Sequence, residues 1–417
     1  MKTMQKGVIR FRFDETVILT LYIALKPLYI SSSGSMQICD IVFAVSIVYM
    51  LIKNKFTIRF SKNEFQWIKP LLIFTVFVLL VNSCWFVRFE IASGMTATSF
   101  LTNSLYYIFN LCAAAICVII VRDVGLDRAI DAICKGCVWS AAINLLGVLI
   151  NQGRHFRTTG FFNNPNQLGF YSIILITFLL YFRNHFKRWE RVLIFLTACY
   201  SIILSLSKAS FVCLFIVCFM FVVVQDGSSR KKRIRKGILL IAIAAALYLF
   251  LFTDVVKLFH SSTLTALRSR ILNMFSENDS SLGSGRGYNR VFEMGSHILW
   301  GMGEGYYGRF KTMPGYEIHS TYASLLVSYG VIGVVMFVSV FAKIFAQRRW
   351  IPINIAYLSG ILLYCFTHNG IRNTLFWILI SFIWIYQNAA YMPSHEQTDL
   401  RGLYGSKARF TKPQELD

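Results

Sequence analysis

Charged residues are scarce in this chain, and their scarcity argues against a water-soluble fold. Of the 417 residues only 15% are Asp, Glu, Lys or Arg, whereas 56% are hydrophobic, and the mean hydropathy is +0.55. Soluble domains carry roughly 25% charged residues. The chain therefore lacks the polar surface that water requires, and its composition indicates a membrane protein.

Several motifs are also missing, and each absence removes a class of function. No phosphate-binding Walker sequence occurs, which argues against ATP-driven transport by this chain alone. No Asp-x-Asp pair occurs, which argues against a metal-held sugar nucleotide. No small-residue cleavage site follows the first apolar segment, so we expect no cleavable signal peptide. Cys134-x-x-Cys137 has no second ligand pair, so we expect these cysteines to pack as small apolar residues.

Long apolar runs are abundant. LLIFTVFVLLV (71–81) and GILLIAIAAALYLFLF (237–252) approach or reach the ~20 residues that cross a bilayer. Each span must be helical, because lipid offers no partner for a free backbone amide. Lys26-Pro27 interrupts the first span, which predicts a kink there or two short pieces. The fold class is an all-α polytopic membrane protein with about twelve spans, near 16–34, 37–53, 67–84, 103–121, 129–151, 167–183, 190–206, 209–225, 237–253, 321–343, 351–367 and 371–391.

The basic residues predict an orientation. Lys and Arg number 42 against 20 acidic residues, which gives a net charge of +22. The basic clusters lie in alternate short loops, so these loops and both termini are expected on the cytoplasmic side. A basic strip at a membrane face meets anionic lipid, and no nucleic-acid partner is needed. The loops with these clusters are 53–69, 183–191, 230–236 and 343–349.

One long loop divides the chain. We expect transmembrane helices over 1–253 and 321–391, an extracytoplasmic loop over 254–320 and a cytoplasmic tail over 392–417. Within the loop, 255–275 has apolar residues at mixed 3–4 spacing, with Arg268 and Arg270 on another face, which predicts an amphipathic surface helix. Glycine clusters then bracket a short helix between 280 and 310. A long loop of this kind is either functional or disordered, and its aromatic and glycine content favours order.

Lys208 is the most unusual cation on the side opposite the basic loops. It lies in SLSKAS (205–210), a very short turn between two spans, where a cation needs an anionic partner or water. Its charge could reach the membrane interface, or it could bind a phosphate-bearing lipid. The cations expected on this side are Arg154, Arg157, Lys208, Arg286, Arg290, Arg309 and Arg372.

Amides are concentrated in TTGFFNNPNQLGFY (158–171), where a span begins. Asn164 fits an N-cap and Pro165 fits the first helical position. A cap accounts for one amide, so Asn163 and Asn166 are candidates to bind sugar or diphosphate oxygens. A helix N-terminus there would also favour an anion.

Four stretches in order carry a family resemblance: RTTGFFNNPNQLGFY, SLSKAS, SGRGYNRVFEM…GMGEGYYGRF and IHSTYASLLVSYGVIGVVMF. Together, over roughly residues 155–345, they resemble the O-antigen ligase and Wzy-type polymerase superfamily. Lys208 stands where the family commonly has arginine, and Ser-Tyr-Gly (328–330) replaces its usual acidic residue before glycine. Lysine keeps the charge but loses the bidentate fork of arginine.

The resemblance implies a GT-C-like glycosyltransferase in the cytoplasmic (inner) membrane. At the outer face it would transfer oligosaccharide from polyprenyl (undecaprenyl) diphosphate to a glycan acceptor, with inversion and without a metal or other cofactor. Membrane lipids would surround it, and a chain-length regulator and a flippase are candidate protein partners. Arg286 and Lys208 would stabilise the leaving diphosphate with support from Arg157, and His319 would be the general base. The implied substrate-binding residues are Arg157, Asn163, Asn164, Asn166 and Arg290.

Alternatives stay open at the level of function. A polymerase and an O-antigen ligase share the donor and differ in the acceptor, and we favour the polymerase because polymerases are the more diverse group. A lipid-linked oligosaccharide flippase would predict internal repeats and paired charges within spans, and we see no convincing repeat. His319 could instead cap a helix beside Ser320. His368-Asn369 in the turn THNGIRN (367–373) could bind sugar, but a turn needs polar residues and glycine in any case, so we leave it outside the catalytic set.

Overall fold

A computed structural model describes most of the chain. The described residues are 14–31, 37–93, 97–152, 154, 156–224, 229–253, 261–273, 287–309 and 317–391. The expected cytoplasmic tail 392–417 and the catalytic candidate Arg286 lie outside these residues. The division into membrane and loop regions therefore stays a prediction.

Every regular element among the described residues is a helix, as the fold class predicts. The first part of the chain forms α1 (Thr16–Leu25), α2 (Ile38–Lys53), α3 (Lys62–Ser93), α4 (Ala97–Val124), α5 (Leu126–Asn151), α6 (Pro165–Tyr181), α7 (Arg188–Ser205), α8 (Lys208–Val224) and α9 (Arg230–Phe252). The long-loop region contains α11 (Ser262–Leu272), η3 (Tyr288–Glu293), η4 (Gly295–Ile298) and α12 (Tyr306–Arg309). The last part forms α13 (Thr321–Phe345), η5 (Arg348–Trp350), α14 (Ile351–Tyr364) and α15 (Thr374–Tyr391).

The expected spans all coincide with helices, but their lengths differ. Five stretches are long and apolar enough to cross a membrane: Lys62–Arg88, Asn103–Val124, Leu126–Asn151, Arg230–Phe252 and Thr321–Phe345. Other apolar helices, such as α6 and α8, are shorter. The structure thus supports a helical membrane protein, whereas the number twelve and the GT-C-like architecture stay predictions.

The first expected span is shorter than its apolar run. It was expected over 16–34, but α1 ends at Leu25, directly before Lys26-Pro27. Proline has no backbone N–H, so the helical ladder stops there. Lys26 is only 5% exposed, and its Nζ lies 3.9 Å from Asp40 Oδ1.

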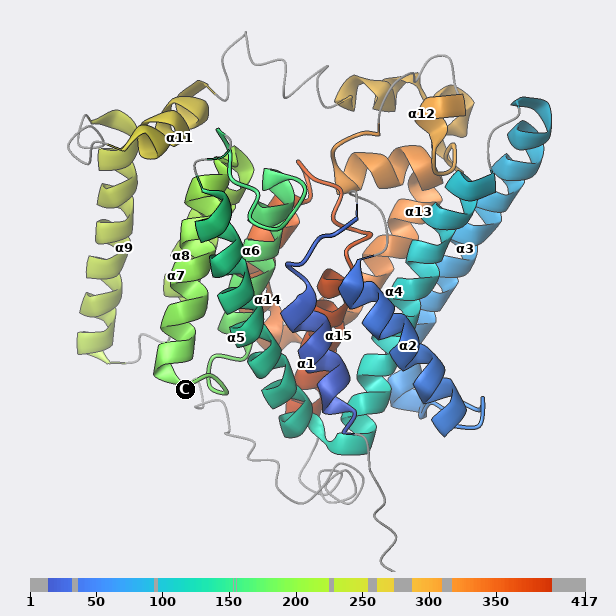
Figure 1. Cartoon of the computed structure of the whole chain (residues 1–417), viewed down its shortest axis with the longest axis horizontal. Helices are drawn as coiled ribbons and strands as arrows, with labels where there is room; N and C mark the ends of the chain where they lie inside the picture. Colours follow the sequence, from blue (N-terminus) through green and yellow to red (C-terminus); the bar gives the residue numbers. More distant parts are fainter. Residues whose placement is uncertain are drawn as a thin grey trace, which may run out of the picture.

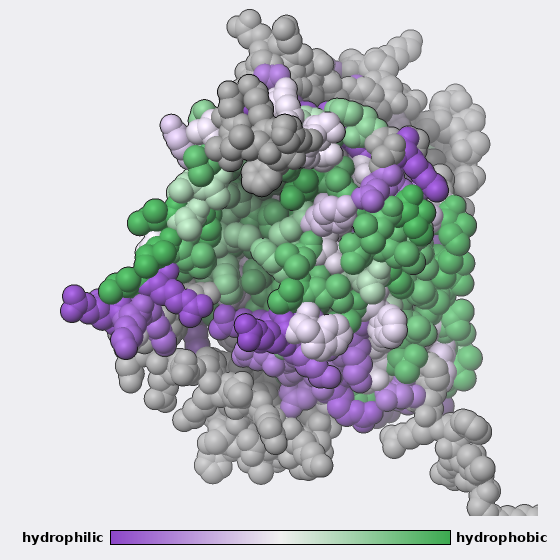
Figure 2. All heavy atoms as spheres, turned by 60° about the vertical axis from the view of Figure 1, so that its left-hand side comes forward, coloured by the Kyte–Doolittle hydropathy of each residue, from purple (hydrophilic) through white to green (hydrophobic). Residues whose placement is uncertain are grey.

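The helices pack side by side in one bundle (Figure 1). α1 packs between α5 and α2, and α15 packs against α4, α13 and α6. α14 packs on α8, while α3 lies at one side of the bundle against α4 and α13. α9 contacts α8 and α11 and buries none of its residues. In the face that Figure 2 shows, apolar side chains form a broad band with hydrophilic residues gathered below it, which is the pattern of a membrane-embedded surface.

Polar contacts tie the helix ends together at one end of the bundle. Lys53 Nζ lies 2.7 Å from Asp123 Oδ2, which joins the end of α2 to the end of α4. Arg128 Nη2 lies 3.1 Å from Asp14 Oδ2, which joins the start of α5 to the start of α1. Because successive helices run up and down, the starts of α6, α8 and α13 lie at the opposite end.

Candidate active site

Four segments meet at that opposite end, and we call the place where they meet the mouth. They are 157–167, which leads into α6, the α7–α8 turn 205–208, the start of α13 at 317–324, and the α14–α15 turn 364–373. Three of them carry motifs of the family resemblance, and the fourth, the α14–α15 turn, carries none.

Hydrogen bonds join the four segments in a continuous series. The first links 157–167 to the α7–α8 turn, the second links α6 to the end of α14, and the third links the α14–α15 turn to the start of α13. The bonds are Arg157 Nε to Ser205 O (2.9 Å), Tyr364 Oη to Asn166 O (2.8 Å) and Thr321 Oγ1 to His368 O (2.8 Å).

The start of α6 follows the expected capping pattern. Asn164 is extended, its side chain accepts a hydrogen bond from Asn166 N at 2.8 Å, and Pro165 occupies the first helical turn. Asn163 instead donates through Nδ2 to Ser31 O at 2.6 Å. The cap therefore uses Asn164, and the side chain of Asn166 remains for another partner.

Replacing the cap gives a small, checkable effect. Asn164→Ala should lower the free energy of unfolding by ~1 kcal/mol, because the N-terminal amides of α6 lose a side-chain acceptor. Asn164→Ser keeps an acceptor and should recover most of the loss. Unfolding of the purified protein in detergent measures both, and an equal loss from Ser and Ala would contradict the capping role.

Arg157 is held between α6 and the α7–α8 turn. Besides its bond to Ser205 O, its Nη2 donates to Asn166 Oδ1 at 2.8 Å. Burial, and then the charge of Arg270, lowers the pKa of Arg157 to about 10. The side chain stays cationic at neutral pH, and a like charge nearby makes a bound anion favourable there.

The α7–α8 turn is compact and carries further cations. Leu206 has a left-handed backbone (φ 49°), which is uncommon outside glycine and ends α7 sharply. Arg270 of α11 donates through Nε to Leu206 O at 3.2 Å. Lys208 is the first residue of α8. We call Arg157, Lys208 and Arg270 the cationic half of the mouth.

An amphipathic surface helix was expected over 255–275, and the structure has α11, Ser262–Leu272, within that range, with a second role; the ends of the expected range lie outside the described residues. Leu267 is buried, and Arg268 Nε donates to Leu251 O at 3.0 Å, which fixes α11 against α9. Sequence reasoning placed Arg270 on the polar face of a surface helix and gave it no part in the site. Only its contact with the α7–α8 turn reveals that part.

His319 lies directly before α13. Ser320 N donates to Ile318 O at 2.9 Å, so the backbone makes a three-residue turn with His319 at its centre. Ser320 caps α13, because its side chain accepts from Ala323 N at 3.3 Å. His319 itself is exposed. The capping role is therefore filled by Ser320, which favours the catalytic interpretation of His319.

Arg372 joins two glutamates next to His319. Its Nη1 and Nη2 donate to the Glu317 carboxylate at 3.1 and 3.0 Å, and Nη2 also donates to Glu304. Glu304 accepts from the hydroxyls of Tyr107 and Tyr329 at 2.8 and 2.9 Å. Burial alone would lower the pKa of Arg372, but the Glu304 and Glu317 carboxylates raise it well above its ordinary value. The result is a largely buried charge network.

Asn369 completes this network. Its Nδ2 donates to Glu317 Oε1 at 2.5 Å, and Ser324 Oγ donates to the same oxygen at 3.2 Å. Asn369 Oδ1 and Arg372 Nε are buried, with no hydrogen-bond partner in the described part of the chain. Such unsatisfied buried atoms are rare in proteins and call for a partner, such as an ordered water or a ligand. We call Glu304, Glu317, Asn369 and Arg372 the acidic half of the mouth.

The acidic half was not expected from the sequence. Arg372 counted only as one outer-side cation, and Asn369 belonged to a turn that could bind sugar but was left outside the catalytic set. Glu304 lies inside GMGEG (301–305) and Glu317 lies two residues before His319, so an acid beside each motif was the available signal.

Glycine fixes the loop that carries Glu304. The backbone N–H groups of residues 302 and 303 donate to the carbonyls of Val327 and Ser328 at 2.8 and 2.9 Å. α13 is kinked beside these carbonyls at Gly330, where φ is 64° and ψ is −170°. That region is essentially restricted to glycine. The kink therefore brings the loop and α13 into direct backbone contact.

A side chain at the position of Gly330 should strongly destabilise the folded protein. A Cβ on Gly330 would lie 2.2 Å from Leu299 O, so Gly330→Ala combines a clash with a strained backbone that alone costs ~1–3 kcal/mol. Gly237 has open space around it and serves as the matched control, because Gly237→Ala in α9 should be neutral or slightly stabilising. Thermal unfolding in detergent compares the two, and equal stability of both variants would contradict the close approach.

The mouth brings together Arg157, Asn166, Lys208 and His319 from the predicted set. Arg290 lies in η3, near Tyr288, whose hydroxyl donates to Phe366 O at the edge of the mouth. Asn163 and Asn164 have the backbone partners described above, and Arg286 lies outside the described residues. The roles of all these residues in transfer stay predictions.

The cysteines and metal ligands give no further site. All ten cysteines are free, with Cys134 and Cys137 buried in α5. Among the described residues, no group of three His, Cys, Asp or Glu side chains could hold a metal ion.

The apolar helices and the charged mouth at one end of their bundle define a helical membrane protein with its candidate site near a membrane face. Residues 192–338 match the model for a family described as O-antigen ligase. The match covers less than half of the chain and supports the resemblance to the O-antigen ligase and Wzy-type polymerase superfamily that the order of motifs predicts. It covers Lys208, Arg270 and His319, but not Arg157 or Arg372. A comparison with curated proteins gives no match.

Proposed function

We propose that the protein is a polysaccharide polymerase of O-antigen, capsule or exopolysaccharide. It transfers oligosaccharide repeat units from polyprenyl diphosphate to a growing lipid-linked glycan at the outer face of the cytoplasmic membrane. The family supports ligase- or polymerase-type activity in general. The observation that carries the proposal is the division of the mouth into a cationic and an acidic half, with His319 on the α13 segment that contacts the acidic half.

The cationic half suits the diphosphate of the donor. Arg157 and Arg270 contact the same turn, at Ser205 O and Leu206 O, and Lys208 follows that turn. Charge develops on the leaving phosphate during transfer, so fixed cations there stabilise the transition state more than the ground state. Arg286 is proposed to join them from the long loop. This assignment extends the predicted set by Arg270.

The acidic half suits the hydroxyl-rich acceptor. The carboxylates of Glu304 and Glu317 share the single guanidinium of Arg372, so this half carries a net negative charge. It would therefore repel a diphosphate. Ionised carboxylates accept hydrogen bonds from hydroxyls. The amide oxygen of Asn369 adds another acceptor. The acceptor sugar therefore binds here, next to the segment that carries His319.

The reaction then follows from these positions. An acceptor hydroxyl attacks the anomeric carbon of the donor, the new glycosidic C–O bond forms, and the bond to the diphosphate breaks. His319 takes the hydroxyl proton, and the lipid diphosphate leaves toward the cationic half. Direct displacement inverts the configuration at the anomeric carbon. The diphosphate is already an activated leaving group, so we expect no metal requirement.

The acceptor decides between a polymerase and a ligase. The test is to incubate the purified protein with a polyprenyl-diphosphate repeat unit and to separate the products on a gel. A ladder longer than one unit supports the polymerase. Transfer of one intact chain to lipid A core without a ladder would instead establish the ligase. Movement of the substrate across vesicles with no new glycosidic bond would establish a flippase.

A further inference from the structure

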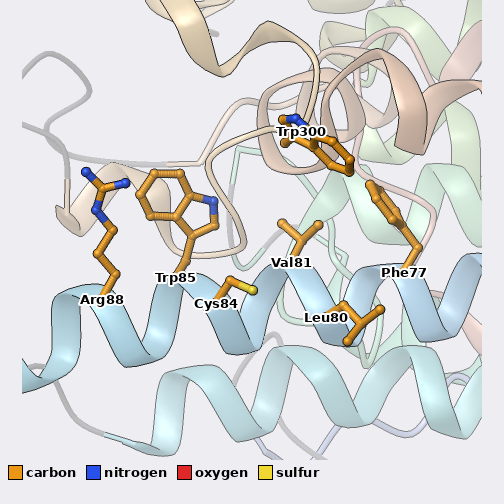
Figure 3. A pocket seen from close by; sticks show the side chains of 7 residues that line it. All are labelled: Phe77, Leu80, Val81, Cys84, Trp85, Arg88 and Trp300. Carbon is orange, nitrogen blue, oxygen red and sulfur yellow. The ribbon is translucent and has the colours of Figure 1, made fainter.

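A separate apolar groove runs along the outer surface of α3, near the mouth end of that helix. Its volume is about 320 Å³, which is at the lower limit of typical ligand sites. α3 forms its floor and Trp300, from the loop after η4, covers one end (Figure 3). The side chains that matter below are Phe77, Leu80, Cys84, Trp85, Arg88 and Trp300.

The α3 residues recur every three or four positions, so they lie on one face of the helix. Leu80 is 60% exposed and Trp300 is 59% exposed, so the groove opens on the surface of the bundle and is not a core cavity. From Phe77 to Arg88 the helix rises roughly 16 Å. That rise is about half of the ~30 Å hydrocarbon thickness of a bilayer, which is the depth of one leaflet.

The groove has a cation at one end and aromatic rings along it. Arg88 Cζ lies 5.3 Å from the centroid of the Trp85 ring, and Figure 3 shows both side chains beside each other at one end of the groove. Phe77 and Trp300 approach each other at the other end, with ring centroids 6.4 Å apart. Tryptophan and arginine at the end of a membrane helix are typical of the headgroup level.

We propose that this groove binds one acyl chain of an anionic phospholipid from the leaflet on the mouth side. The chain lies along Leu80 and Cys84, and the phosphate lies beside Arg88. A phospholipid fits better than the polyprenyl diphosphate donor, because one arginine matches one phosphate. The diphosphate carries more charge and suits the clustered cations of the mouth.

The helix that forms the groove is hydrogen-bonded to the loop that carries Glu304 of the acidic half. Trp85 Nε1 donates to Gly301 O at 3.1 Å, in the same loop that carries Glu304. Asn82, one turn earlier on α3, accepts from Glu304 N at 2.9 Å. A lipid between α3 and Trp300 therefore supports the loop from the membrane side. Binding of the lipid does not depend on the transfer reaction.

Native mass spectrometry of the detergent-purified protein tests the proposal with phosphatidylglycerol and phosphatidylcholine as probes. The wild type should prefer phosphatidylglycerol by about fivefold, the factor that one basic residue supplies at ~1 kcal/mol. Arg88→Gln should reduce the preference to about one. Cys84→Phe should reduce binding of both lipids, because the exposed Cys84 side chain borders the groove and a ring there fills it.

Two matched control variants distinguish lipid binding in the groove from general contact between lipid and the protein surface. Arg59→Gln is the control for Arg88→Gln, because it removes an equal charge just before the other end of α3. Val335→Phe is the control for Cys84→Phe, because it enlarges an exposed side chain on a different helix, α13. Both should retain the wild-type preference. Equal binding of the two lipids by the wild type, unchanged binding in Arg88→Gln and Cys84→Phe, or displacement of phosphatidylglycerol by equimolar polyprenyl diphosphate would overturn the proposal. If Cys84→Phe does not fold, Leu80→Phe fills the groove from a neighbouring position.

Discussion

Replacing His319 by alanine is expected to slow repeat-unit transfer by about two to four orders of magnitude, the usual contribution of a general base. The acceptor hydroxyl would lose its proposed proton acceptor, while the cationic half, which we propose to stabilise the leaving group, stays in place. The rate of glycan extension by purified protein, measured on a gel over time, gives the magnitude. Because a histidine base is protonated as pH falls, the wild-type rate should decline on the acid side, and the His319→Ala variant should lose that part of the profile.

The neighbouring cap provides the control for this experiment. Ser320→Ala removes the acceptor of Ala323 N and should cost ~1 kcal/mol of stability with little effect on transfer. His319→Ala should show the reverse, a large loss of transfer with near-normal unfolding. Extension at the wild-type rate by His319→Ala would remove this residue from the mechanism.

Removing the charge of Arg372 should have the largest effect on stability. Arg372→Met leaves Glu304, whose side chain is only 4% exposed, and Glu317 without their shared cation. Breaking a buried ion pair from one side typically costs ~3–5 kcal/mol, because an uncompensated charge stays buried. Thermal unfolding in detergent measures this loss of stability. The rate of transfer should also fall, because the variant would lose the order of the acidic half.

A charge-balanced double variant shows whether electrostatics is the cause. Glu304→Gln combined with Arg372→Met removes one charge of each sign and should recover part of the stability lost in the single variant. Arg372→Lys keeps the charge but cannot form the fork to Glu317, so an intermediate stability is expected. A double variant that is no more stable than Arg372→Met would contradict the charge argument.

Local rules predicted the helices well. Apolar runs, the Asn164 cap and the amphipathic pattern of α11 are properties of neighbouring residues, and the structure confirms each of them. Lys26-Pro27 predicted a kink or two short pieces, whereas in the structure α1 ends at Leu25 and residues 28–31 are not helical. Periodicity could not choose between them, because the missing N–H of proline permits either a kink or an end.

The acidic half could not be predicted because its contacts join distant parts of the chain. Arg372 bonds to Glu304 and Glu317 across 68 and 55 residues, and nothing local in THNGIRN requires those partners. Arg270 likewise meets Leu206 across 64 residues. Motifs identified three of the four segments that line the mouth, whereas the pairing within it depends on how α13 and the last turn pack.

The kink at Gly330 has a consequence for how a growing glycan could be accommodated. Backbone bonds from residues 302 and 303 fasten the Glu304 loop to α13, and α13 begins directly after His319. His319, the proposed proton acceptor, and Glu304 are therefore carried on one packed unit, whereas the cations belong to the segment before α6, to α8 and to α11. Glu304 is also held by Asn82 of α3 and Tyr107 of α4, so we expect the outer part of α13 to stay fixed on α3 and α4 while the segments that carry the cations move relative to it. Successive repeat units could then pass through the mouth without the base losing its alignment to the acceptor.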